Sequence, residues 1–168
     1  WNTSGHSSVL ERGADYGLYQ AHEMLDMVEQ FMLSGVDVAH AWPLLQNTAN
    51  TFSPGFSHEA LTPAGEMFAL MSDSLPGLRM VDLNDDDRET EAEGAALDLH
   101  AFVGDDRMVL FLASTSADPE TTTIDLSGLL DGWGATAAVR LGVAEGAHPG
   151  DTLSEAVVSV LDGAELVQ

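Results

Sequence analysis

The 168-residue sequence carries 28 acidic and only 5 basic side chains, which gives a formal charge of −23. Such a charge argues against nucleic acid and anionic membrane surfaces as partners, because both would repel it. The absence of cysteine excludes disulfides and thiolate metal sites. The hydrophobic content of 45% is enough for a packed core, and no apolar run reaches the roughly 20 residues of a membrane-spanning helix. We therefore expect a soluble, acidic, folded chain.

The stretch from Ala14 to Trp42 predicts an amphipathic helix followed by a short strand. Apolar residues recur three or four positions apart, which places them on one stripe of a helix: Ala14, Leu18, Ala21, Leu25, Val28 and Met32. Ser34 and Gly35 are expected to end the helix, because glycine adopts the left-handed conformation without steric cost. Residues 36–42 then predict a strand. A helix that leads directly into an apolar strand is typical of α/β folds with parallel sheets.

A second helix is predicted after a long polar loop. Thr62 suits the N-cap position and Pro63 the first helical position, and Pro76-Gly77 is expected to end the helix. The acidic stretch that follows, residues 81–95, has the composition of a linker between two domains.

Beyond the linker the hydrophobic pattern changes to a period of two. Residues 97–103 and 108–113 are predicted to pair across a turn at Gly104-Asp105-Asp106. Further strands are expected at residues 122–126, 135–143 and 156–161. Short strands separated by turns are typical of a β-sandwich.

The order of these elements resembles the C-terminal part of the Glu-pair TIM-barrel glycoside hydrolases, of the α-L-arabinofuranosidase and β-xylosidase kind. In that family a strand ends in Glu-Trp-Asn, and Trp1-Asn2 of this chain would be the tail of that seventh barrel strand. The resemblance implies an α/β plus all-β fold class. Residues 1–80 would form the last βα units of a (β/α)8 barrel, residues 81–95 an acidic linker, and residues 96–168 a truncated antiparallel β-sandwich.

The resemblance also implies a function. The chain would be the C-terminal fragment of a secreted glycoside hydrolase that acts on plant or algal polysaccharide by a retaining two-glutamate mechanism. Both glutamates would lie outside this sequence, one of them directly before Trp1, so no catalytic residue is assigned. Residues of the chain would contact the sugar by aromatic stacking and hydrogen bonding: Trp1, Asn2, His40, Trp42, Gln46 and Asn47. The expected partner is a polysaccharide or oligosaccharide, the expected location is extracellular, and no cofactor or metal is expected.

An alternative is a non-catalytic carbohydrate- or calcium-binding module of a large acidic extracellular protein. Asp82, Asn84, Asp86 and Glu93 have the spacing of calcium ligands in an EF-hand loop, but Asp87 stands where that loop needs glycine. A solvated acidic linker explains the same residues. The six histidines include no pair at the spacing of a zinc site, and no Gly-x-Ser-x-Gly motif is present. A domain without any site is the third interpretation.

Overall fold

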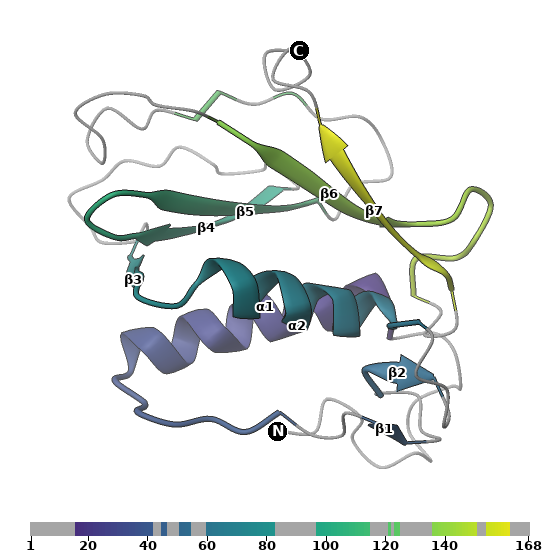
Figure 1. The fold of residues 1–168 in the computed structure, drawn as a ribbon, viewed down its shortest axis with the longest axis horizontal. Coiled ribbons are helices and arrows are strands. Elements are labelled where there is room, and N and C mark those ends of the chain that lie inside the picture. The colour runs from purple at the N-terminus through teal and green to yellow at the C-terminus, as the bar shows by residue number, and fades with distance from the viewer. Residues whose placement is uncertain are drawn as a thin grey trace.

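Two helices, two antiparallel sheets and one short parallel strand pair make up the described part of the protein. The computed structural model describes residues 16–41, 45–46, 51–54, 60–82, 97–114, 121, 123–124, 136–150 and 154–161. Helices α1 (Leu18–Leu33) and α2 (Pro63–Ser74) lie side by side in one layer, beneath the longer strands (Figure 1).

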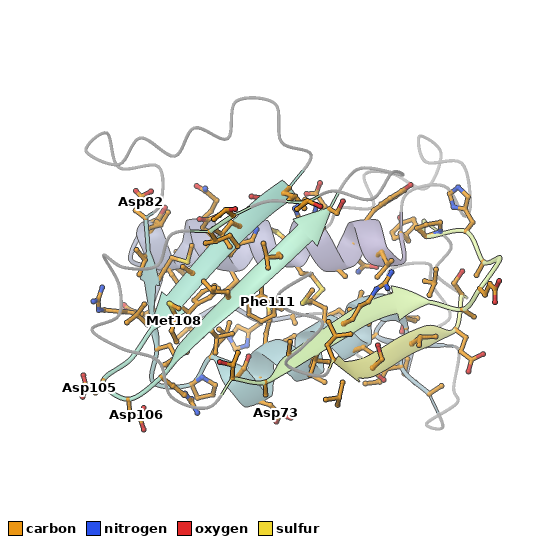
Figure 2. All side chains as sticks on the ribbon, turned by 90° about the horizontal axis from the view of Figure 1, so that it is seen from above. Asp73, Asp82, Asp105, Asp106, Met108 and Phe111 are labelled. Carbon is orange, nitrogen blue, oxygen red and sulfur yellow. The ribbon has the colours of Figure 1, made fainter. Side chains whose placement is uncertain are left out.

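The strands form three sheets. One antiparallel sheet contains β3 (Arg79–Val81), β4 (Leu97–Val103) and β5 (Met108–Ser114), in that order, and the second pairs β6 (Ala138–Val143) with β7 (Ala156–Leu161). The strands β1 (Leu45–Gln46) and β2 (Ser53–Pro54) form a short parallel pair. Figure 2 looks down on the strands and shows Asp105 and Asp106 at the turn between β4 and β5.

The ends of α1 are fixed by backbone hydrogen bonds. At its start, the amides of Tyr16 and Leu18 donate to the carbonyls of Gly150 and Pro149, at 3.1 and 2.8 Å, so a loop between β6 and β7 satisfies amides that have no partner within the helix. At its end, the Ser34 amide donates to Gln30, and Gly35 has a φ of 69°. The predicted helix and its predicted end are confirmed.

Helix α2 begins with the predicted cap. The Thr62 hydroxyl accepts a hydrogen bond of 3.1 Å from the Gly65 amide, and Pro63 occupies the first helical position, where its missing N–H costs nothing. The chain leaves the helix through Gly77, at a φ of 83°. Both predicted helix boundaries are therefore confirmed.

The core lies between the helices and β4. Its buried members come from both helices, from the segment before α2 and from β4: Met24, Leu25, Phe52, Ala64, Met71 and Phe102. The Phe102 ring packs edge-to-face on Phe111 of β5, with ring centroids 5.9 Å apart. Burial of Phe102 shows that one face of β4, the face that also carries Asp98 and His100, is turned toward the helices.

Most of the predicted strands are present. The β4–β5 ladder runs from the pair Leu97 and Ser114 to the pair Val103 and Met108, which confirms the predicted hairpin. Strand β7 has the predicted bounds, and β6 covers most of residues 135–143. Of the predicted strand at 122–126, only residues 123 and 124 are described, and neither belongs to a strand.

The predicted fold class, however, is wrong. Residues 36–41 form no strand, and Val36 and Val38 are 46% and 68% exposed. The Val36 amide donates to the Phe31 carbonyl at 2.9 Å, so it closes the end of α1 and pairs with no strand. The sheets rest on the helices, with β6 and β7 against α2 and β3 against α1. The described residues thus make a small, mostly β structure with few helices, in place of the last βα units of a TIM barrel followed by a β-sandwich.

The predicted linker falls mainly outside the described residues, which resume at Leu97 after Asp82. Strands on its two sides, β3 and β4, pair with each other in antiparallel register from Arg79 and Val103 to Val81 and Ala101. The division into domains at residues 81–95 stays a prediction, as does calcium binding by Asp82 to Glu93.

Candidate metal centre

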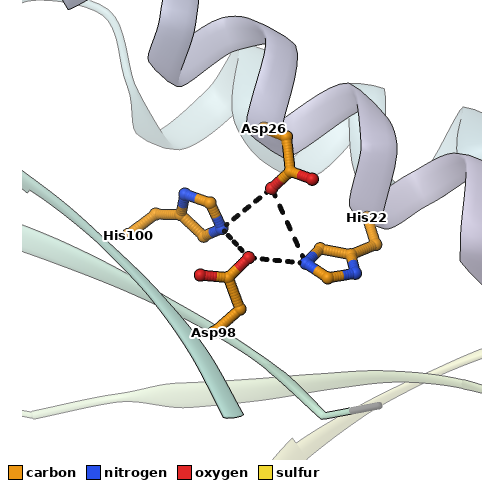
Figure 3. Close-up of side chains that lie close together, drawn as sticks. All are labelled: His22, Asp26, Asp98 and His100. Atoms are coloured by element: carbon orange, nitrogen blue, oxygen red, sulfur yellow. Dashed lines mark hydrogen bonds and ion pairs between the residues drawn. The ribbon is translucent and has the colours of Figure 1, made fainter. Parts of the chain in front are cut away.

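Two His–Asp pairs meet between α1 and β4. On α1, His22 and Asp26 are four residues apart, so their side chains lie one above the other on the same face of the helix. On β4, Asp98 and His100 are alternate residues of a strand and share the face that is turned toward the helices. Figure 3 shows the four side chains pointing toward one another across the gap between these elements.

Nitrogen and oxygen atoms alternate around this four-residue cluster. His22 Nε2 lies 2.8 Å from Asp98 Oδ2, which lies 3.2 Å from His100 Nε2. His100 Nε2 is 3.5 Å from Asp26 Oδ1, which is 3.6 Å from His22 Nε2 (Figure 3). The four atoms all lie within 4.8 Å of one another. Each residue therefore offers one ligand atom to a common centre.

His100 is the most buried member of the cluster, with its side chain 1% exposed. Its Nδ1 lies 3.0 Å from Oε2 of Glu29, a residue of α1 whose side chain is 12% exposed. Its Nε2 faces oxygens of Asp26 and Asp98, but in neither case with the geometry of a hydrogen bond. Among the described residues this buried nitrogen has no hydrogen-bond partner. A buried polar atom in that condition calls for an explanation.

The carboxyl groups around His100 have shifted pKa values. Burial raises the pKa of Asp26, and the charge of Asp98 adds to the effect against the lowering by His22. Burial also raises the pKa of Glu29, opposed by His100. For Asp98 burial again acts upward, but the hydrogen bond from His22 and the charges of both histidines prevail, so its pKa is lowered. The folded protein thus holds two carboxyl groups, Asp26 and Glu29, whose ionised forms extra positive charge would stabilise.

The size and chemistry of the cluster suit a metal ion. A tetrahedral zinc ion with bonds of about 2.0–2.1 Å to nitrogen and oxygen holds its ligand atoms about 3.3 Å apart. Four of the six separations, from 2.8 to 3.6 Å, lie on both sides of that value, and the two that remain are within 4.8 Å. Two imidazoles and two carboxylates are ligands that zinc and related divalent transition metals accept.

Of the residues predicted to bind sugar, only His40 and Gln46 belong to the described part of the chain, and neither is a member of the cluster. Trp1, Asn2, Trp42 and Asn47 fall outside the described residues, and Gln46 lies in β1. His40 is exposed and lines a pocket of about 210 Å³ between the two helices, among mainly apolar side chains that include Met24 and Phe31 of α1 and Met71 of α2. Sugar binding by these residues stays a prediction.

Sequence reasoning missed the cluster because it searched for pairs of histidines. Here each element supplies one histidine and one aspartate, in the patterns His-x-x-x-Asp on the helix and Asp-x-His on the strand. Both spacings place the two side chains on one face, so each was a recognisable half-site. The pairing of α1 with β4, residues 76 positions apart, was not visible from either pattern.

Comparison with known proteins yields no match: no family model, no curated protein and no solved structure is similar to this chain. The hydrolase function, its polysaccharide substrate and the extracellular location therefore stay predictions from the sequence. None of the helices in the described part of the chain has the length and apolar character needed to cross a bilayer.

Proposed function

We propose that this protein binds one divalent transition-metal ion, zinc in the first place, through His22, Asp26, Asp98 and His100, and that the ion joins α1 to β4. The observation that carries the proposal is the buried Nε2 of His100, which faces two carboxylate oxygens without a hydrogen bond. A nitrogen lone pair and carboxylate oxygens repel one another unless a cation lies between them.

A proton could take the place of the ion and make His100 an imidazolium. A protonated Nε2 would then be expected to donate a hydrogen bond to one oxygen, as His22 Nε2 does with Asp98 at 2.8 Å. The His100 nitrogen instead faces the oxygens of Asp26 and Asp98 together, at 3.5 and 3.2 Å (Figure 3). This orientation favours a shared central ion over a single hydrogen bond.

The proposed role of the ion is structural. Four protein ligands complete a tetrahedral shell, which is the arrangement of zinc sites that stabilise a fold. The ligands come from two elements far apart in sequence, and an ion that binds both closes a long loop of the chain. Free energy of metal binding then becomes free energy of folding, because the unfolded chain does not bring the four ligands together.

The test is zinc affinity, measured by competition with a chromophoric chelator on untagged, chelator-treated protein. We expect one ion per chain and expect Asp98→Asn to weaken binding by more than about 100-fold, because it removes a charged ligand. Asp105→Asn, at the exposed β4–β5 turn, is the matched control and should bind like the wild type. Cobalt(II) in place of zinc should give the visible absorption of a tetrahedral centre.

Two results would overturn the proposal. One is a wild-type chain that takes up no ion at micromolar zinc. The other is an Asp98→Asn variant that binds as tightly as the wild type while far-ultraviolet circular dichroism shows both to be folded, since the ion would then lie at other residues.

A further inference from the structure

We infer that Glu29 is a positioning residue of the proposed metal site: it fixes the tautomer of His100 so that Nε2 presents its lone pair to the ion. The inference rests on the proposed function. Glu29 contributes none of the four ligand atoms, and its part in the site comes from its contact with the far side of the His100 ring.

The geometry places Glu29 directly behind His100. It follows Asp26 by three residues, so the helix turns it toward the same side of α1, one turn further along. Its Oε2 lies 3.0 Å from His100 Nδ1, and the two side chains are 12% and 1% exposed. Little water reaches this contact, so the carboxylate is the partner that decides the protonation of Nδ1.

The geometry favours one tautomer of a neutral ring, because hydrogen-bond geometry is met at Nδ1, toward Glu29, and not at Nε2. An ionised carboxylate only accepts hydrogen bonds, so Nδ1 must carry the hydrogen that it donates to Glu29. A neutral imidazole has a single N–H, and the other nitrogen is then an acceptor with a free lone pair. The lone pair falls on Nε2, the atom that faces Asp26 and Asp98. Carboxylate–histidine–metal arrangements of this kind orient a ligand and strengthen its bond to the ion.

Replacement of Glu29 by glutamine tests the effect on the His100 tautomer while the shape of side chain 29 is kept. Glutamine has the same size, but its amide can donate to Nδ1 as well as accept from it. When it donates, the ring hydrogen moves to Nε2, and that nitrogen can no longer bind an ion. The variant Glu29→Gln should therefore bind zinc roughly 10–100-fold more weakly. Glu23→Gln on the exposed side of α1 makes the same change of charge and should bind like the wild type.

A second measurement reads the tautomer itself. Long-range ¹H–¹⁵N correlation spectra of the metal-free protein distinguish a protonated Nδ1 from a protonated Nε2. For the wild type and Glu23→Gln we expect His100 to be protonated at Nδ1. For Glu29→Gln we expect a mixture of tautomers, or the Nε2-protonated form. A purely structural role of Glu29 would not produce that change.

The outcomes separate this inference from the proposed function. If the wild type binds zinc but Glu29→Gln binds it equally well, the metal site stands and the role of Glu29 is overturned. An unchanged tautomer in Glu29→Gln also overturns it, even where affinity falls. If the wild type binds no zinc, the proposed function fails, whereas the tautomer spectra still decide whether Glu29 sets the protonation of His100.

Discussion

The two inward faces of helix α1 differ in the interactions that stabilise them. The face toward α2 carries Ala21, Met24 and Leu25, which are at most 3% exposed and pack into the core. The face toward β4 carries His22, Asp26 and Glu29, which meet Asp98 and His100 in polar contacts. The first face is stabilised by burial alone and tolerates any neighbour of suitable shape. The second is satisfied only when specific partners and charges are present.

This difference teaches that the polar side of an amphipathic helix is not always its solvent side. Residues 22, 26 and 29 follow the same three- and four-residue spacing as the apolar stripe, so they form a second stripe of their own. An apolar stripe contributes stability in any solution in which water is the solvent. The contribution of the polar stripe to stability should depend on the concentration of the metal ion and on the pH.

The largest effect is expected on the apolar face. Leu25→Ala should lower the free energy of unfolding by about 2–5 kcal/mol, because Leu25 is 1% exposed and its removal leaves a cavity in the core. Chemical denaturation monitored by circular dichroism measures the loss, with and without zinc. Leu33→Ala, at a site 42% exposed on the same helix, is the control and should change stability by less than about 1 kcal/mol.

The loss in Leu25→Ala should be nearly the same in zinc and in chelator, since the apolar face holds no ligand. A loss that vanishes when zinc is added would mean that the two faces of α1 are coupled, and that the ion rather than the core holds the helix in place.

The next largest effect is the increase in the free energy of unfolding when zinc binds the polar face of α1. Free zinc at about 100 times its dissociation constant should raise the free energy of unfolding by about 2.7 kcal/mol. Protons compete with the ion for the imidazole and carboxylate ligands, so the gain should shrink as the pH falls. Thermal unfolding at several zinc concentrations and pH values measures it. A gain that persists unchanged at the acid end would contradict ligation by the histidines.

The sequence predicted the parts of the fold that local chemistry decides. Thr62-Pro63 marked the start of α2, and Gly35 marked the end of α1, because a cap or a left-handed glycine acts within a few residues of itself. Residues 36–42 were predicted as a strand on the same kind of local pattern, and the prediction was wrong for the described residues 36–41. A strand forms only when it pairs with another strand. That pairing depends on tertiary contacts, which a local sequence pattern does not contain.

The same reasoning explains the candidate site. His22 with Asp26, and Asp98 with His100, were each visible as a pair, but only the packing of α1 on β4 brings the pairs within reach of one ion. The predicted sugar-binding set depended on a barrel that the described residues do not form. Its one member with a described side chain, His40, lines an apolar pocket on the other side of α1 from the cluster.

The smallest effect is the stability change caused by Asp26→Asn. It tests the comparison of the two faces of α1 most directly, because its sign should differ between metal-free and zinc-bound protein. Burial raises the folded-state pKa of Asp26, so its stabilising contribution is present below the unfolded value, about pH 4, and is lost as pH rises through the folded value. At pH 7 without metal, the ionised side chain therefore opposes folding. Asp26→Asn should then stabilise the metal-free protein slightly, by no more than about 0.5 kcal/mol, because the side chain is 41% exposed.

With zinc the order should reverse. The carboxylate of Asp26 is then a ligand, so Asp26→Asn should lose most of the stabilisation that zinc gives the wild type. The two proteins should also converge in stability without metal as the pH falls through the raised pKa of Asp26, where its carboxylate takes up a proton. Parallel unfolding curves in chelator and in zinc decide the matter. If Asp26→Asn is the less stable protein in both solutions by the same amount, Asp26 acts as an ordinary ion-pair partner of the histidines, and the polar face of α1 needs no metal.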